Sequence, residues 1–245
     1  MVGMSVLRLD TPFVDPAAVA PGGVEGVAWT AGDIEIPMRH CPGRLDGKVG
    51  IVTGAGSRGP GVGTGKAIAV IFAREGCRVL LADAVIDGAE ETLASIRAEG
   101  GEASATQVDV TQSGECHQMV EAAVDRYGRL DILVNNVSIL APGNVIDVAE
   151  ADWDRVIATN LKSMMLTSEY ALPHRIAGGG GAIVNLASFM ALRAGYESEP
   201  VAYSASMGGV LALTTTMASE HGPGTISAST RSLRDTCIRQ WWRRT

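Results

Sequence analysis

The stretch Val49-Gly50-Ile51-Val52-Thr53-Gly54-Ala55-Gly56-Ser57 decides how this chain folds. A short apolar run ends in a glycine-rich loop that continues to Gly65, and helix-forming residues follow from Lys66 to Glu75. A strand, a glycine loop and a helix in this order present backbone N–H groups and a helix N-terminus to a phosphate. Glycine suits the loop because a side chain would hold a pyrophosphate away from the backbone. Such loops also occur as ordinary turns, so the rest of the chain must support the phosphate hypothesis.

Beyond this loop, apolar runs of strand length alternate with helical patterns. Strands are expected at 49–53, 78–83, 104–108, 131–136 and 182–186, and helices at 66–75, 88–99, 113–127, 150–172 and 201–220. Gly76 is expected to end the first helix, and a good N-cap to begin the helix at Ser113. This alternation predicts βαβ units, a parallel sheet and right-handed crossovers. The sequence therefore predicts an α/β protein with a doubly wound parallel sheet in a single domain, residues 44–224.

Composition limits the classes of function. The chain has 245 residues, 46% of them hydrophobic, which suffices for one sizeable core. Its formal net charge of −7 argues against nucleic acid or an anionic membrane as a partner, and no apolar run reaches the roughly 20 residues that span a bilayer. The four cysteines and four histidines show no metal-ligand spacing, which predicts reduced thiols in a cytoplasmic protein without a metal site.

The first 43 residues differ from the rest of the chain. They are rich in proline, glycine and valine and have no sustained helical or strand period. We expect a disordered or loosely packed leader there, with a short paired strand within 24–36 as the alternative. The segment lacks the basic start and apolar core of a secretory signal.

Asp83 ends the second expected strand. A carboxylate at this place can accept hydrogen bonds from the 2′- and 3′-hydroxyls of an adenosine ribose and would repel a 2′-phosphate, which favours NAD over NADP. The alternative is a strand-end aspartate that caps the next turn.

Separated motifs together resemble those of the short-chain dehydrogenase/reductase family, over about residues 47–221. The family's TGxxxGxG is similar to Thr53-Gly54…Gly63-Thr64-Gly65, here with Arg58–Val62 inserted. Its NNAG is similar to Asn135-Asn136-Val137-Ser138, and its YxxxK falls on the five residues from Tyr203 to Met207. The resemblance implies a Rossmann-like fold. It also implies NAD as cofactor, held by Gly54, Ser57, Arg58, Gly63, Gly65, Asp83, Asp109, Val110, Asn136, Val137, Ser138 and Tyr203.

The same resemblance implies a reaction, the transfer of a hydride between NAD(H) and a secondary alcohol or ketone. Tyr203 would be the acid or base at the substrate oxygen, Ser188 would hydrogen-bond that oxygen, and Asn160 would link the site to solvent through a backbone kink and a water. Each residue also has a structural reading, such as Ser188 as a strand-end turn residue. Members of the family are usually homo-tetramers or dimers.

Met207 stands where the family has a lysine, whose ammonium holds the nicotinamide ribose and favours the tyrosinate. An unperturbed tyrosine has a pKa of about 10, so roughly one in a thousand is ionised at pH 7. A cation about 4 Å away, at an effective dielectric near 20, would supply up to roughly 4 kcal/mol. Methionine supplies neither charge nor donor, so we expect slow turnover or none. Val137 and Ser138 are milder departures from the family's Ala-Gly.

After Gly224 the resemblance stops, and residues 225–245 form a basic tail that contains Trp241 and Trp242. One frame-shifted back-translation of the first tail residues reads His-Asp-Ile-Arg-Val-Asn-Ala-Ile, which resembles the strand that the family has next. A frameshift near Gly224 is therefore our hypothesis. If the tail is genuine, the sheet lacks its last two strands. The alternatives to an active enzyme are a non-catalytic NAD-binding pseudoenzyme that acts through protein partners, and a truncated product that does not fold stably.

Overall fold

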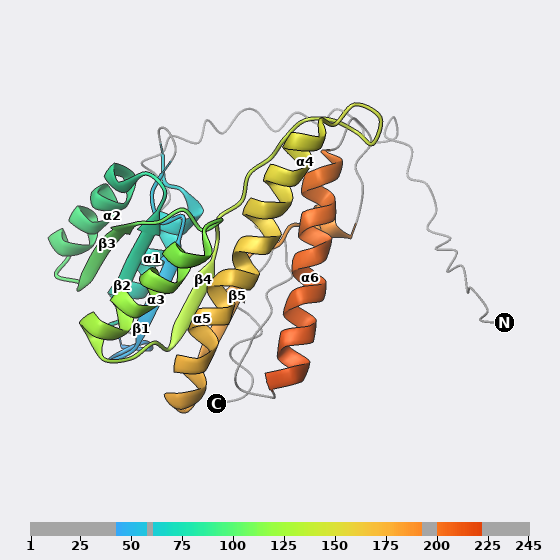
Figure 1. The fold of residues 1–245 in the computed structure, drawn as a ribbon. Coiled ribbons are helices and arrows are strands. Elements are labelled where there is room, and N and C mark those ends of the chain that lie inside the picture. The colour runs from blue at the N-terminus through green and yellow to red at the C-terminus, as the bar shows by residue number, and fades with distance from the viewer. Residues whose placement is uncertain (1–42, 58–60, 193–199, 222–245) are drawn as a thin grey trace, which may run out of the picture. The chain divides into compact units, whose positions relative to one another are not determined.

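Five parallel strands form one sheet in the order β3-β2-β1-β4-β5 (Figure 1). The computed structural model describes residues 43–57, 61–192 and 200–221, all within one compact unit, Arg39–Thr245. The strands are β1 (Val49–Thr53), β2 (Arg78–Asp83), β3 (Ala103–Gln107), β4 (Ile132–Asn135) and β5 (Ala182–Asn185). The predicted parallel α/β sheet is confirmed.

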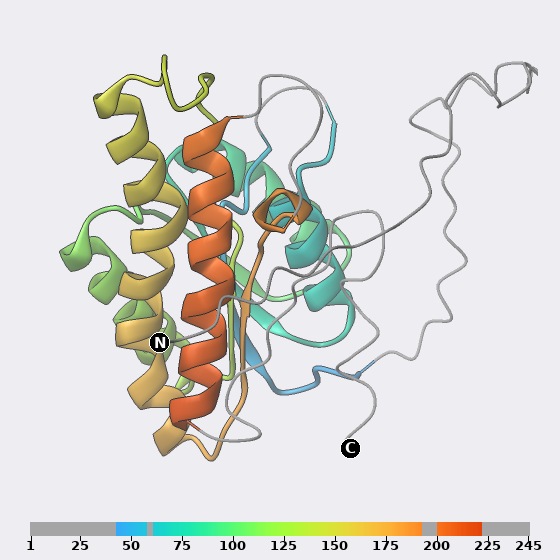
Figure 2. The same cartoon turned by 90° about the vertical axis from the view of Figure 1, so that its right-hand side faces the viewer.

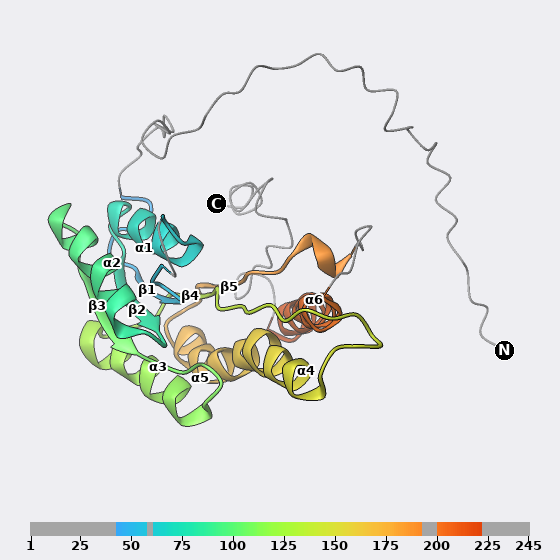
Figure 3. The same ribbon diagram turned by 90° about the horizontal axis from the view of Figure 1, so that it is seen from above.

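Helices cover both faces of this sheet. Helices α1 (Thr64–Arg74) and α2 (Ile86–Ala98) lie on one face, while α3 (Ser113–Tyr127) and α5 (Ser163–Ala177) lie on the other (Figures 1 and 3). The remaining helices are α4 (Glu150–Ile157) and α6 (Val201–His221), with a short π-helical turn at Ala158–Lys162 and a 3₁₀ turn at Phe189–Ala191. The sheet is thus doubly wound, as the alternating pattern predicted.

The core lies on both faces of the central strands. All five residues of β1 are buried, as expected where helices cover both sides of a parallel sheet. On one face Ile51 and Leu80 join a cluster that includes Met119 of α3, and on the other Val52 joins a cluster that includes Ala69 of α1. Full burial of one such aliphatic side chain contributes about 1.5–3 kcal/mol.

A single helix was expected at 150–172, but the helical run continues from Glu150 to Ala177 and contains the π-helical turn. Pro173 lies inside α5 without ending it. Both Pro173 and Glu169, whose carbonyl loses its partner, are exposed, so water can satisfy that carbonyl. The run lies beside α6 (Figure 2).

The expected N-cap of α3 is wrong in its detail. The cap residue is Gln112, and no side chain caps the helix. Gly76 does follow α1 with a positive φ of 88°, the conformation that commonly ends a helix and suits glycine.

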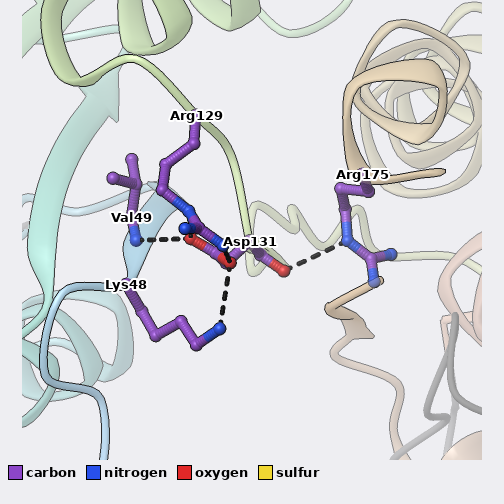
Figure 4. A network of polar contacts seen from close by, with 5 residues as sticks. All are labelled: Lys48, Val49, Arg129, Asp131 and Arg175. Carbon is purple, nitrogen blue, oxygen red and sulfur yellow. Dashed lines mark hydrogen bonds and ion pairs between the residues drawn. The ribbon is translucent and has the colours of Figure 1, made fainter. Parts of the chain in front are cut away.

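Asp131 joins several elements at the amino end of β4 (Figure 4). Its carboxylate accepts hydrogen bonds from Arg129 (2.6 and 2.8 Å), from Lys48 Nζ (3.2 Å) and from the Val49 N–H (3.0 Å). Burial opposes its ionisation, but these donors hold the pKa of Asp131 below its usual value. Its backbone carbonyl accepts a hydrogen bond from Arg175 Nε (3.1 Å).

Arg175 is a fully buried cation on α5, with 0% of its surface exposed. Within the described part of the chain, its Nη1 and Nη2 atoms have no acceptor. Burial lowers its pKa to about 10, although the charge of Asp131 opposes the shift. Gly181, with φ at +150°, leaves room for the guanidinium, since a Cβ there would lie 2.9 Å from Nη2 and collide with the Asp131 carbonyl.

The predicted leader, apart from Gly43, and the predicted tail at 225–245 lie outside the described residues, as does the place expected for further strands. Of the helices within the described ranges, none combines the length and apolarity needed to cross a membrane.

Candidate functional site

A cleft of about 490 Å³ opens where β1, β2 and β4 end. It lies at the point where the strand order reverses, between β1 and β4, which is the usual ligand position in doubly wound sheets. Most of the predicted cofactor residues line it, namely Gly54, Gly63, Gly65, Asp83, Asp109, Val110, Asn136, Val137 and Ser138. The fold therefore gathers residues from five separate segments around one cavity of ligand size.

The glycine loop packs tightly on the start of α1. Gly54 has a φ of +64°, and a Cβ on Gly65 would collide with the Gly54 carbonyl. Helix α1 begins after Gly63 without a side-chain cap. Because Gly63, Thr64 and Gly65 line the cleft, the first-turn N–H groups of α1 border it and can bind an anion.

Ser57, predicted to contact the cofactor, instead makes a hydrogen bond within the glycine loop. It does not line the cleft, and its Oγ accepts a hydrogen bond from the Gly63 N–H (2.9 Å). Arg58, predicted to lie near a phosphate, falls outside the described residues.

Asp83 lines the cleft from the end of β2. One carboxylate oxygen accepts a hydrogen bond from the Gly56 N–H (2.9 Å) and the other from the Val85 N–H (3.0 Å). The bond to Val85 is the turn-capping contact of the alternative interpretation. An ionised carboxylate has about four acceptor positions, so a ribose diol remains compatible with both bonds.

Asn136 fastens the glycine loop to β4. Its Nδ2 donates to the carbonyls of Thr53 and Gly54 (both 3.1 Å), and its backbone N–H donates to Thr53 Oγ1 (3.1 Å). Thr53 Oγ1 in turn donates to the Val134 carbonyl (3.2 Å). Thr53 thereby holds the ends of β1 and β4 together, a role that the motif reading did not give it.

Asp109 is exposed, and its carboxylate accepts hydrogen bonds from the Thr111 N–H (2.9 Å) and hydroxyl (2.7 Å). Its backbone N–H donates to Glu115 Oε2 (2.7 Å), while Val110 is buried. The cleft wall at Asp109 is thus held by local bonds.

Asn160 lies in the π-helical turn with none of its surface exposed. Its Oδ1 accepts a hydrogen bond from the Ile139 N–H (2.7 Å), and its Nδ2 donates to the Ile139 carbonyl (2.9 Å) and to Ser206 Oγ (3.0 Å). Ser206 Oγ donates to the Tyr203 carbonyl (2.7 Å). A π-helical turn interrupts the α-helix where the backbone kink was predicted, and the Asn160 side chain joins the cleft wall at Ile139 to α6.

Ser188 and Tyr203 are half-buried, and neither lines the cleft. Ser188 Oγ accepts a hydrogen bond from the Met190 N–H (3.3 Å) and caps the 3₁₀ turn, which is the structural reading anticipated for it. Met207 is 1% exposed inside the fold. The structure brings most of the predicted cofactor residues together at the cleft, without Ser57 and Tyr203, and leaves the predicted catalytic residues on neighbouring elements.

Two cysteines and their surroundings carry no sign of chemistry. Burial raises the pKa of Cys77 to about 12 and that of Cys116 to about 11, so both remain thiols near neutral pH. In the part of the chain that the structure covers, no three His, Cys, Asp or Glu side chains are grouped to hold a metal ion.

The sequence motifs gave no role to several polar residues whose hydrogen bonds support the site, namely Thr53, Asn135, Asn185 and Ser206. The available signal was weak. Thr53, Asn135 and Asn185 are polar residues that end otherwise apolar strands, and polar groups buried at strand ends need partners.

Comparison with known proteins places these observations in a family. The short chain dehydrogenase family model matches residues 48–232. An uncharacterized oxidoreductase of Thermotoga maritima is 40% identical over 179 residues, which are 72% of this chain and 67% of that protein. The D-threitol dehydrogenase of Mycolicibacterium smegmatis is 34% identical over 189 residues, 77% of this chain and 70% of that protein.

A solved structure of a 7α-hydroxysteroid dehydrogenase, complexed with NADH and 7-oxo glycochenodeoxycholic acid, has a TM-score of 0.69 and 32% identity. The similarity covers 76% of this chain and 69% of that one. The chain belongs to the short-chain dehydrogenase/reductase family.

Proposed function

We propose that this protein is an NAD-dependent oxidoreductase that transfers a hydride between a secondary alcohol or ketone and the nicotinamide. The observation that carries the proposal is the cleft at the β1/β4 reversal, whose wall combines the glycine loop, the uncapped start of α1 and Asp83. These groups suit a dinucleotide because they pair N–H donors for a pyrophosphate with a carboxylate for a ribose.

The residues that would hold NAD divide along the cleft. The loop at Gly54 and the start of α1 at Gly63–Gly65 would receive the pyrophosphate, with Arg58 as a further phosphate contact. Asp83 would bind the adenosine ribose, and Asp109 and Val110 would border the adenine. Asn136, Val137 and Ser138, together with Tyr203, would border the nicotinamide half. Asp83 favours NAD over NADP because a 2′-phosphate would face its negative charge.

When bound, the cofactor would accept or return the hydride, and the chain's own groups would move the proton. Tyr203 would take the proton of the substrate hydroxyl, or return it to a ketone oxygen in the reverse direction. Ser188 would donate a hydrogen bond to that oxygen. Its hydroxyl hydrogen is free to do so, because Ser188 Oγ only accepts in its bond from the Met190 N–H. Asn160 would fix the backbone around the site and connect it to solvent through a water.

The relatives support this class of substrate only in outline. One is named for threitol, a small polyol, and another was solved with a steroid ketone. The first compound is an alcohol and the second a ketone, so the proposed substrate is a small-molecule alcohol or ketone. We propose no nucleic-acid or membrane partner. We propose a cytoplasmic location, because the spacing of the four cysteines predicts reduced thiols. A homodimer or homotetramer, as is usual in the family, is the expected assembly.

Met207 favours a second candidate, a non-catalytic NAD-binding protein that acts through protein partners. The side chain is buried and carries no charge, so the tyrosinate at Tyr203 would lack the cation that the family uses. We therefore propose a slow enzyme first and a pseudoenzyme second, with the frameshift near Gly224 as a further source of impairment.

Two assays separate these possibilities. NADH titration followed by its fluorescence should show saturable binding, and failure to bind would contradict both candidates. An absorbance assay at 340 nm with NAD and a panel of secondary alcohols should then show slow, alcohol-dependent NADH formation in the enzyme. Saturable binding without turnover, even after Met207→Lys, would favour the pseudoenzyme. Resequencing the gene across the Gly224 codon tests the frameshift.

A further inference from the structure

A buried row of hydrogen bonds crosses from α5 to α6 through the ends of β4 and β5. Thr167 Oγ1 donates to Asn135 Oδ1 (2.8 Å), and Asn135 Nδ2 donates to Asn185 Oδ1 (2.8 Å). Asn185 Nδ2 donates to Thr214 Oγ1 (2.9 Å), which donates to the Val210 carbonyl (2.6 Å). Asn135 and Asn185 are directly paired in the parallel register of β4 and β5.

Each side chain in the row is almost completely removed from solvent. Thr167 and Asn185 are 1% exposed, and Asn135 and Thr214 are 2% exposed. Asn135, Asn185 and Thr214 each accept one bond and donate the next, while Thr167 begins the row as a donor and also has the Ser163 carbonyl within reach (3.0 Å). A row of this kind fixes the geometry of the elements it joins, because breaking one bond leaves a buried polar group unpaired.

The elements joined by the row are those that carry the proposed nicotinamide half of the site. Asn135 immediately precedes Asn136 on the cleft wall, and Ser188 follows Asn185 on the segment after β5. Tyr203 and Thr214 both belong to α6. The adenine half depends on other contacts, such as the bond from Gly56 to Asp83, which lie at β1 and β2.

We infer that Asn185 is a positioning residue, which sets the place of Ser188 and Tyr203 relative to the nicotinamide through Asn135 and Thr214. This inference rests on the proposed function. Asn185 does not line the cleft, so it acts through its two partners. The expected consequence is selective: loss of the row should disturb binding of the nicotinamide and leave the adenine half intact.

The test uses the full chain with two probes, ADP-ribose for the adenine half and NADH for the whole site. The variants are Asn185→Leu, the near-isosteric Thr214→Val, and Thr214→Ser, which keeps the hydroxyl. Tyr127→Phe is the matched control, because it removes a buried hydrogen bond to Ser104 (2.9 Å) between α3 and β3, away from the row.

We expect Asn185→Leu and Thr214→Val to bind ADP-ribose within about twofold of the parent, while NADH affinity falls about tenfold, the scale of one unpaired buried group. The enhanced emission of bound NADH should fall with it. Thr214→Ser and Tyr127→Phe should retain both signals. If Asn185→Leu does not fold, the comparison of Thr214→Val with Thr214→Ser decides.

Equal losses for ADP-ribose and NADH would show a general structural role and overturn the inference, as would unchanged NADH binding in Thr214→Val. A parent protein that binds neither probe would overturn the proposed function, and the positioning role with it. A parent that binds both, with variants that do not discriminate, would overturn the positioning role alone.

Discussion

Arg175 donates its Nε hydrogen bond to the backbone carbonyl of Asp131, 3.1 Å away, and not to the carboxylate. The carboxylate is occupied by Arg129, Lys48 and the Val49 N–H (Figure 4). The Asp131 carboxylate therefore binds two half-exposed cations, whereas the buried Arg175 guanidinium, among the described residues, has a backbone carbonyl as its hydrogen-bond acceptor. The two residues are expected to have opposite effects on stability.

Replacing Arg175 by methionine should stabilise the protein. Burial lowers the pKa of Arg175 to about 10 in the folded protein, so the charged form is penalised in the folded state. That penalty is present at neutral pH and is relieved only as the pH rises above about 10. Urea unfolding at pH 7 should show an increase of about 1–4 kcal/mol in the free energy of unfolding for Arg175→Met. The exposed Arg97→Met should change stability by less than about 0.5 kcal/mol, and a destabilised Arg175→Met would contradict the argument.

Replacing Asp131 by asparagine should destabilise the protein by about 1.5–3 kcal/mol. The buried carboxylate is lost as a charged acceptor, whereas Arg129 and Lys48 are half-exposed and can be solvated by water. The pKa of Asp131 is lowered on folding. Its contribution is therefore complete above the ordinary value of 3.8 and is lost as the pH falls through the lower folded value. Between pH 2 and 7, the free energy of unfolding should depend more steeply on pH in the parent than in Asp131→Asn. The exposed Asp125→Asn serves as control, and parallel pH profiles would refute the prediction.

Asp83 should determine the choice of cofactor. Asp83→Asn keeps an acceptor for the Gly56 N–H but removes the negative charge that would face a 2′-phosphate. We expect NADH affinity to fall about tenfold, the scale of a charged hydrogen bond, and NADPH affinity to rise. Fluorescence titration with both nucleotides measures the ratio, with the exposed Asp87→Asn as control. A ratio that does not move would mean that Asp83 only closes the loop and the turn at Val85.

Met207→Lys should raise the rate of alcohol oxidation. A cation about 4 Å from the phenol supplies up to roughly 4 kcal/mol towards the tyrosinate, so a gain of at least tenfold is expected. Because Met207 is buried, the lysine should also lower the melting temperature unless its amine reaches the cleft. NADH formation at pH 7 with the best alcohol measures the gain, and Met207→Gln controls for shape. A parent that already turns over rapidly would contradict the role given to this position.

The sequence was sufficient where glycine and apolar runs dictate the backbone. The strands at Val49–Thr53 and Arg78–Asp83 were predicted with their observed bounds, because each is an apolar run ended by a turn or a carboxylate. The π-helical turn around Asn160 was not predicted, and a backbone kink at this residue was expected only through the family resemblance. The local residues include neither glycine nor proline, and the kink is held by bonds from Asn160 to Ile139 and Ser206, which are distant in sequence.

The residues of the cleft also differ in how well the sequence predicts them. Asp83 and the glycines could be predicted to lie together because a motif links residue type to position, whereas Thr53 and Asn185 act through partners on other segments of the chain. The burial of Arg175 could not be foreseen, since a cation near the end of a helix ordinarily interacts with its free carbonyls or with water. The packing of α5 against β4, which places the Arg175 guanidinium beside the Asp131 carbonyl, shows that this side chain faces inward.

The hydrogen bond from the Gly63 N–H to Ser57 Oγ holds two separate points of the glycine loop together. Ser57 and Gly63 flank the inserted residues 58–62 in the sequence, so the distance between the two ends of the insertion is set by this bond and not by the number of residues inserted. Lengthening or shortening the insertion is therefore expected to leave the walls of the cleft intact. The insertion offers a place where natural variation, or a grafted peptide, can be accommodated beside the cleft.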